Sequence, residues 1–278
     1  MIWQTARHDI DLSEPRVMGI VNVTPDSFSD GGQHADARAA LAHCEQLLAE
    51  GAHILDIGGE STRPGARQPS LDEEMARVLP VVRQAVTLGV PVSVDTSRPD
   101  LMRAALDLGA DIVNDVRALA RPGAVEVLAA HPRAGVCLMH MRGEPGDMQQ
   151  APAYDDVVAE VSAFLSQRAQ VVQAAGIAAV RIVLDPGIGF GKTPAHNLAL
   201  LARQRELLAL GWPLLVGWSR KSTLGQLTGR AAGERAVASA AAALLAVERG
   251  AAVLRVHDVA ATVDALKVLQ AVRQATPR

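Results

Sequence analysis

The sequence is poor in cysteine, aromatic residues and net charge, and each shortage excludes a class of protein. Two cysteines in 278 residues, Cys44 and Cys137, are too few for a disulfide framework or a zinc site and favour a reducing cytoplasm. A net charge of −3 provides no basic field for nucleic acid. Aromatic residues make up only 3% of the chain and apolar residues 49%, so small aliphatic side chains must fill a large core.

Long apolar segments are also missing. The first ten residues, MIWQTARHDI, lack the apolar stretch of a signal peptide. The longest apolar tract, residues 236–254, is rich in alanine and is interrupted at Glu248–Gly250, which predicts a helix, a turn and a strand instead of a membrane span. We therefore expect a soluble protein with no membrane or nucleic-acid partner.

Short apolar segments alternate with helical patterns along the whole chain. The expected strands, each too apolar to face water, are 17–21, 53–57, 92–95, 112–114, 135–139, 181–184, 214–216 and 253–256. The expected helices are 35–50, 72–88, 98–108, 123–130, 155–176, 196–210, 231–250 and 259–274.

This alternation predicts an α/β protein with a single (β/α)8 TIM barrel over residues 17–278. Residues 1–16 are expected to form an extension that caps the bottom of the barrel. The alternative, an open doubly wound sheet, would require a glycine-rich turn after the first strand. The chain has Asn22–Pro25 there, and this segment contains no glycine.

Polar residues lie at the carboxyl ends of the expected strands. Because the carboxyl ends of parallel strands meet at one end of a barrel, their side chains should line one mouth. They are Asn22, Asp56, Asp95, Asn114, Asp115, His140, Asp185, Ser219–Ser222 and Arg255–Asp258.

Two chemical sets occur among these residues. Asp95, Asn114, Asp185 and Lys221 suit a flat, amide-rich heterocycle, because a carboxylate accepts two N–H bonds from such an edge. A cationic set suits phosphate groups, with Asn22 as an oxygen ligand of phosphate-bound Mg²⁺. Its members are Arg63, Arg255 and His257. One mouth with both sets predicts a heterocycle that carries a phosphate group.

Each residue also has a purely structural interpretation. A lone aspartate such as Asp95 is more often a helix N-cap than a ligand, and Asp258 is expected to be one. Arg255 could equally be half of a structural ion pair. His140, between two methionines, is more often a packed core histidine than a base. The functional hypothesis therefore depends on the coincidence of these residues at one end of the barrel.

The segment Asp185–Thr193, DPGIGFGKT, is close to two nucleotide-binding motifs but matches neither. A Walker A loop would need glycine where Pro186 stands, and a dinucleotide fingerprint would need glycine in place of Lys192. The glycines instead favour a sharp turn over a flat ligand, with Phe190 as an apolar wall.

Taken together, these blocks resemble the dihydropteroate synthases of folate biosynthesis, a pterin-binding family. The matching blocks are MGIVNVTPDSFSDGG (18–32), DIGGESTRPGA (56–66), SVDT (93–96), NDV (114–116), LMHM (138–141), DPGIGFGK (185–192), SRKS (219–222) and RVHDV (255–259). They cover nearly the whole chain.

The resemblance implies a transferase that condenses 6-hydroxymethyl-7,8-dihydropterin pyrophosphate with p-aminobenzoate by an SN1-like displacement, giving 7,8-dihydropteroate and pyrophosphate. It implies that the pterin is held by Asp95, Asn114, Asp185 and Lys221. It places the pyrophosphate and Mg²⁺ at Asn22, Arg63, Arg255 and His257, with Asn22 as the metal ligand. It frames the p-aminobenzoate with Thr62, Arg63, Pro64, Phe190, Lys221 and Ser222. The catalytic residues would be Arg63, Lys221, Arg255 and His257.

The resemblance further implies a cytoplasmic homodimer and a sulfonamide target. Two alternatives stay open. A pterin-dependent methyltransferase domain shares the fold and the pterin pocket, but it has no use for a pyrophosphate clamp such as Arg63 with Arg255 and His257. A non-catalytic paralogue would bind pterin without releasing pyrophosphate.

Overall fold

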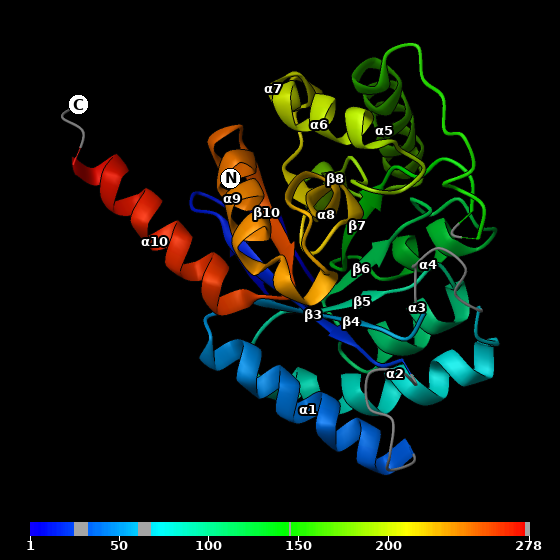
Figure 1. Ribbon diagram of the computed structural model, residues 1–278. Helices are drawn as coiled ribbons and strands as arrows, with labels where there is room; N and C mark the ends of the chain where they lie inside the picture. Colours follow the sequence, from blue (N-terminus) through cyan, green and yellow to red (C-terminus); the bar gives the residue numbers. More distant parts are fainter. Residues whose placement is uncertain (25–32, 61–67, 145, 276–278) are drawn as a thin grey trace.

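In the computed structural model, eight parallel strands close into a barrel that helices surround (Figure 1). The structure describes residues 1–24, 33–60, 68–144 and 146–275. The barrel strands pair in chain order, and the last closes on the first with Leu254 opposite Val17. They are β3 (Arg16–Asn22), β4 (Ile54–Gly58), β5 (Val92–Asp95), β6 (Ile112–Asp115), β7 (Gly135–Met139), β8 (Ile182–Asp185), β9 (Leu214–Val216) and β10 (Ala251–Val256). The predicted (β/α)8 barrel is confirmed, and so is each predicted strand.

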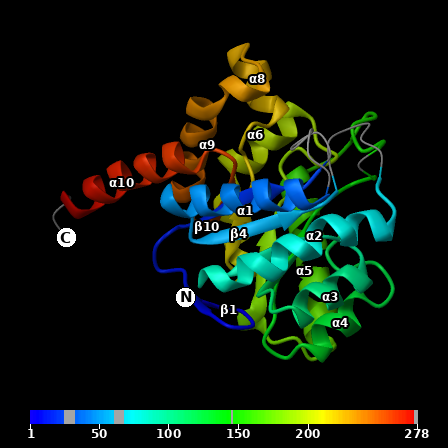
Figure 2. The same ribbon diagram turned by 90° about the horizontal axis from the view of Figure 1, so that it is seen from below.

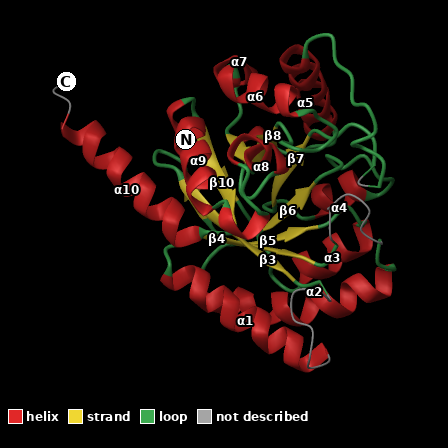
Figure 3. Ribbon diagram, viewed as in Figure 1, coloured by secondary structure: helices red, strands yellow, loops and turns green. Residues whose placement is uncertain are grey.

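Helices lie around the strands on the outside of the barrel (Figure 3). The α-helices are α1 (Gln33–Ala49), α2 (Leu71–Ala85), α3 (Pro99–Asp107), α4 (Ala124–Ala130), α5 (Val157–Ala174), α6 (Pro194–Ala202), α7 (Gln204–Leu207), α8 (Ser222–Thr228), α9 (Ala236–Glu248) and α10 (Val259–Ala275). Short 3-10 turns are η2 (Val86–Leu88), η3 (Ala179–Arg181), η4 (Leu208–Leu210) and η5 (Ala232–Glu234).

Several helical segments differ from expectation. The helix predicted over 231–250 comprises η5 and α9, and that over 72–88 comprises α2 and η2. The helix predicted over 196–210 is divided into α6, α7 and η4, because the backbone leaves helical geometry at Arg203 (φ −103°, ψ 16°). The guanidinium of Arg203 there pairs with Asp156 and Glu206. Helix α8 was not predicted, since seven residues around Gly225 are too few to display a helical period.

Helix α2 shows how the local sequence sets a helix and its buried face. The Ser70 hydroxyl accepts a hydrogen bond from the backbone N–H of Glu73, whose carboxylate accepts one from the N–H of Ser70. Val78, Val81 and Val82 follow at helical spacing and are fully buried against the barrel.

An N-terminal hairpin lies at the end of the barrel where the strands begin (Figure 2). It consists of β1 (Ile2–Gln4) and β2 (Asp9–Asp11), with Trp3 opposite Ile10. The Trp3 indole is fully buried and donates a hydrogen bond to the carbonyl of Arg181, directly before β8. Within the chain's described part, no helix is both long and apolar enough to cross a membrane. The tract 236–254 forms α9, a turn and the beginning of β10, as predicted.

Candidate active site

Four side chains from different strands meet inside the mouth of the barrel, and we call them the barrel quartet. They are Asp56 of β4, Asp95 of β5, Asn114 of β6 and Arg255 of β10. The Nε of Arg255 lies 2.6 Å from Oδ2 of Asp56, and its Nη2 lies 2.7 Å from Oδ2 of Asp95. The amide of Asn114 donates to Oδ2 of Asp56 at 3.1 Å. One guanidinium therefore bridges two carboxylates across the barrel.

The electrostatics of the quartet follow from its burial. Burial raises the pKa of Asp95 to about 7. The charge of Arg255 lowers this pKa, and the charge of Asp56 raises it. Burial also works against the charged form of Arg255, but the two carboxylates outweigh it and raise the pKa of Arg255 above its ordinary value. The arginine thus stays cationic in the mouth of the barrel.

Asp56 is a residue to which sequence reasoning assigned no role, although it belongs to the polar strand ends. Its side chain is fully buried. Its Oδ1 atom has no hydrogen-bond partner among the described residues, while Oδ2 serves both Arg255 and Asn114. A buried, unpaired acceptor is costly unless a ligand uses it. The position of Asp56 as a carboxylate within the buried strand β4, near its carboxyl end, is the signal that could have marked it.

Asp185, Phe190 and Lys221 line the other side of the mouth. The Oδ1 atom of Asp185 accepts a hydrogen bond from the N–H of Gly187 at 2.7 Å, and burial raises the pKa of Asp185 to about 6. The Nζ of Lys221 lies 4.2 Å from the centre of the Phe190 ring. Burial lowers the pKa of Lys221 to about 8, although Asp185 opposes the shift. Lys221 is therefore largely charged at neutral pH.

His257 and Ser219 form a hydrogen-bonded pair after β10 and β9. The hydroxyl of Ser219 accepts from the backbone N–H of His257 at 3.1 Å and lies 3.0 Å from Nδ1 of the same residue. In the tautomer in which Ser219 donates to Nδ1, the ring proton of His257 is on Nε2. Burial, followed by the charge of Arg255, lowers the pKa of His257 to about 3.

The low pKa makes the His257 ring neutral near pH 7, whereas the sequence placed His257 in a cationic set. Its role toward the pyrophosphate stays a prediction. The same low pKa argues against Ser219 as a nucleophile, because His257 would be a poor base for its proton.

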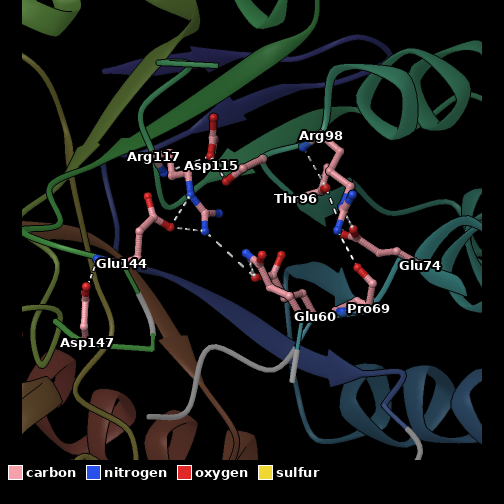
Figure 4. A network of polar contacts seen from close by, with 11 residues as sticks. Glu60, Pro69, Glu74, Thr96, Arg98, Asp115, Arg117, Glu144 and Asp147 are labelled. Atoms are coloured by element: carbon pink, nitrogen blue, oxygen red, sulfur yellow. Dashed lines mark hydrogen bonds and ion pairs between the residues drawn. The ribbon is translucent and has the colours of Figure 1, made fainter. Parts of the chain in front are cut away.

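A network of ion pairs links the loops that follow β4 to β7 (Figure 4). On one side, Arg98 pairs with the buried Glu74 at 2.7 Å, and Thr96 donates to the same carboxylate at 2.9 Å. On the other side, Arg117 pairs with Glu144 at 2.6 Å. Sequence reasoning did not anticipate this network, because its members are separated along the chain and belong to no shared motif.

The remaining predicted site residues fall in three places. Asn22 is half-buried at the end of β3, and Ser222 is exposed at the start of α8. Thr62, Arg63 and Pro64 lie outside the described residues.

The structural interpretations have mixed outcomes. Asp95 is not the N-cap of α3, where Arg98 stands, but pairs with Arg255. Asp258, expected to cap a helix, directly precedes α10, and its carbonyl accepts a hydrogen bond from the N–H of Thr262. Its carboxylate pairs with Arg220 at 2.6 Å. His140 is a packed histidine, as predicted, with its ring edge-on to Phe164 at 4.9 Å. The ion-pair interpretation of Arg255 is confirmed.

The comparisons with known proteins agree with this geometry. A family model described as pterin binding enzyme matches residues 18–257. The dihydropteroate synthase of Neisseria meningitidis serogroup B is 57% identical over 276 residues, which are 97% of each chain. A Xanthomonas albilineans dihydropteroate synthase solved with 4-aminobenzoic acid aligns with a TM-score of 0.93 and 54% identity over 99% of each chain. A structure of the X. albilineans enzyme in complex with 7,8-dihydropteroate aligns with a TM-score of 0.91 and 50% identity over 100% of each chain. With a barrel of this topology, these polar strand ends and relatives of this similarity, the chain belongs to the pterin binding enzymes and, among them, to the dihydropteroate synthases.

Proposed function

We propose that the chain condenses 6-hydroxymethyl-7,8-dihydropterin pyrophosphate with p-aminobenzoate, giving 7,8-dihydropteroate and pyrophosphate. The observation that carries this proposal is the barrel quartet, in which Arg255 is bonded to Asp56 and Asp95, and Asn114 to Asp56. A cation suited to phosphate thereby lies beside acceptors suited to a heterocycle. A flat, amide-rich ring that carries a pyrophosphate uses both.

The proposed pterin contacts, apart from the donor Lys221, are hydrogen-bond acceptors, and three of them have capacity left for a ligand. Asp185 uses Oδ1 for the Gly187 N–H and keeps Oδ2. Asn114 donates through its amide nitrogen and keeps its amide oxygen. The unpaired Oδ1 of Asp56 is a further acceptor. Asp95 and Lys221 complete the proposed contacts. This acceptor-rich set favours a ring edge with several N–H donors.

Pyrophosphate departure is the step that the cationic side of the site would assist. The C–O bond breaks, its electron pair leaves with the pyrophosphate, and negative charge grows on the leaving group. Arg255 supplies charge, and its Nη1 group has no partner within the described part of the chain. His257 would donate a hydrogen bond to the leaving group through Nε2 when Ser219 donates to its Nδ1. Arg63 lies outside the described residues, so its role rests on the resemblance alone.

Attack by p-aminobenzoate follows the loss of pyrophosphate. The electron-rich dihydropterin ring stabilises the methylene cation, so no nucleophilic side chain is required. The arylamine nitrogen forms the new bond to the methylene carbon and releases a proton. Phe190, Lys221 and Ser222 are the described residues proposed to frame this second substrate, together with Thr62, Arg63 and Pro64. The contribution of this pocket is chiefly positioning.

Magnesium is proposed to accompany the pyrophosphate. Across the described ranges, no group of three or more His, Cys, Asp or Glu side chains could hold a metal ion. Asn22 offers one amide oxygen at the end of β3. Mg²⁺ is commonly held by one or two protein oxygens together with substrate phosphates, so this donor set fits the ion. When bound, the ion would neutralise charge on the leaving group.

We further propose a cytoplasmic homodimer through the late helices. Val237 and Leu245 of α9 are 83% and 42% exposed, and Val268 of the neighbouring α10 is 64% exposed. Exposed apolar side chains on adjacent helices favour an interface. Sedimentation velocity tests this proposal, since a monomer at micromolar concentration would contradict it. Both cysteines, Cys44 and Cys137, are free and buried, which suits a reducing compartment.

The decisive experiment measures pyrophosphate release from dihydropterin pyrophosphate with Mg²⁺, with and without p-aminobenzoate. Release that depends on p-aminobenzoate, yields dihydropteroate and is blocked by a sulfonamide supports the proposal. Tight pterin binding without release under any of these conditions would favour a methyl-transfer relative or a non-catalytic pterin binder.

A further inference from the structure

A buried lysine holds the loop between β8 and α6 in place. Lys192 is 2% exposed. Its Nζ lies 2.9 Å from Nδ1 of His140, 2.9 Å from the carbonyl oxygen of Gly187 and 3.0 Å from that of Phe190. Burial lowers the pKa of Lys192 to about 7, although Asp185 opposes the shift. In the ammonium form each of its three N–H bonds finds an acceptor here. Lys192 is thus fully occupied within the protein and does not itself reach a substrate.

His140 is the fixed end of this arrangement. It follows β7 and is packed against Phe164. Burial, followed by the charge of Lys192, lowers the pKa of His140 to about 3, so its ring is neutral and Nδ1 can accept. The lysine therefore joins the end of one strand to the loop after the next.

The loop itself lies directly on the backbone that follows β7. Gly187 and Gly191 have φ values of 67° and 62°, and a Cβ on either would overlap the carbonyl oxygen of His140 or Arg142. On its other side, Gln149 donates to the carbonyl of Gly189 at 2.6 Å. Among the described residues, the carbonyl of Phe190 is bonded to Lys192 alone.

We propose that Lys192 is a positioning residue for the second substrate, because its hydrogen bond to the Phe190 carbonyl sets where the Phe190 ring lies in the mouth of the barrel. The position of Asp185 depends less on the hydrogen bonds of Lys192, because Asp185 belongs to β8 and pairs in register with Met139. Loss of Lys192 should therefore weaken the binding of p-aminobenzoate beside Phe190 more than the binding of the pterin at Asp185. The inference rests on the proposed condensation for the identity of the second substrate.

The test replaces Lys192 with methionine, which keeps the length and removes the donors. Calorimetry measures binding of 6-hydroxymethyl-7,8-dihydropterin alone, and of p-aminobenzoate with that pterin and pyrophosphate present. We expect the Kd of p-aminobenzoate to rise at least tenfold and the Kd of the pterin to change less than threefold. These binding readouts need no turnover, so failure of the proposed condensation, seen as absent pyrophosphate release by the unaltered chain, is a separate result.

A matched control exists at the opposite end of the barrel. Arg181 is also 2% exposed and donates to three backbone carbonyls, those of Leu128, His131 and Ala134. Arg181→Met should lower Tm, as Lys192→Met should, but leave both dissociation constants unchanged. If Lys192→Met does not fold, Lys192→Gln, which keeps an amide donor, is measured in its place with the same expected order of effects. Equal losses for the two ligands, or no loss for p-aminobenzoate, would overturn the proposal.

Discussion

Replacing Arg255 with methionine separates its effect on stability from its effect on turnover. The change leaves the carboxylate of Asp56, which is fully buried, and that of Asp95, which is 15% exposed, without their shared cation. Removing one partner of a buried ion pair typically costs about 3–5 kcal/mol. Arg255 itself is 22% exposed, so water reaches part of the site and the lower end, about 3 kcal/mol, is expected.

The corresponding change in Tm follows from the length of the chain. An unfolding entropy of about 2.1 cal/mol/K per residue makes 3 kcal/mol equivalent to a fall in Tm of about 5 °C for a chain of 278 residues. The relative loss of turnover should be larger than the loss of stability. We expect kcat to fall by about 10²–10³, as for loss of a charged contact to a developing anion. Calorimetry and the pyrophosphate-release assay measure the two effects independently.

A double variant distinguishes the electrostatic explanation from simple loss of packing. Asp56→Asn combined with Arg255→Met removes one of the two stranded carboxylates and should recover about half of the lost Tm without restoring turnover. Lowering the pH from 8 to 5 should also reduce the Tm deficit of Arg255→Met. The reason is that Arg255 opposes the raised pKa of Asp95, so without it the carboxyl takes up a proton more readily in the folded state. A Tm deficit that neither change reduces would refute the electrostatic reasoning, and near-normal turnover would refute the pyrophosphate assignment.

Three further predictions concern other parts of the molecule. Gly187→Ala should destabilise the protein by several kcal/mol, because the new Cβ would overlap the His140 carbonyl at a positive φ, and urea denaturation should detect it as a lower midpoint. Asp111→Asn should cost about 2 kcal/mol, because the buried carboxylate accepts from Arg7 and from the N–H of Val92 at the bottom of the barrel. Its kcat/KM should stay normal, and a kinetic defect in the folded variant would contradict the assignment of the site to the other end. The imidazole NMR signals of His140 and His257 should not titrate between pH 5 and 8, because burial lowers both pKa values to about 3. These neutral histidines stabilise the fold above pH 6.5, and the contribution decreases as the pH falls toward 3, so a titration near pH 6.5 would show the reasoning to be wrong.

The strands and the location of the site were predictable because they depend on local patterns and on one rule of topology. Apolar segments such as Val92–Asp95 and Leu214–Val216 formed strands with the predicted bounds. Their polar ends had to converge, because parallel strands in a closed barrel present their carboxyl ends to the same mouth. Shared blocks along nearly the whole chain indicated the family, and the comparisons confirmed it.

The partners within the site were decided only by the tertiary structure. Arg255 and Asp56 are 199 residues apart, and no periodicity in the sequence expresses their 2.6 Å contact. The sequence shows Lys192 only as a residue that departs from a nucleotide-binding motif and indicates no partner for the Asp258 carboxylate. The fold buries Lys192 and pairs Asp258 with Arg220. The sequence by itself determined which residues reach the mouth of the barrel, because backbone periodicity and strand direction are local properties. Which of them bond to one another, and with what charge, depends on distances and burial that arise only when the barrel closes.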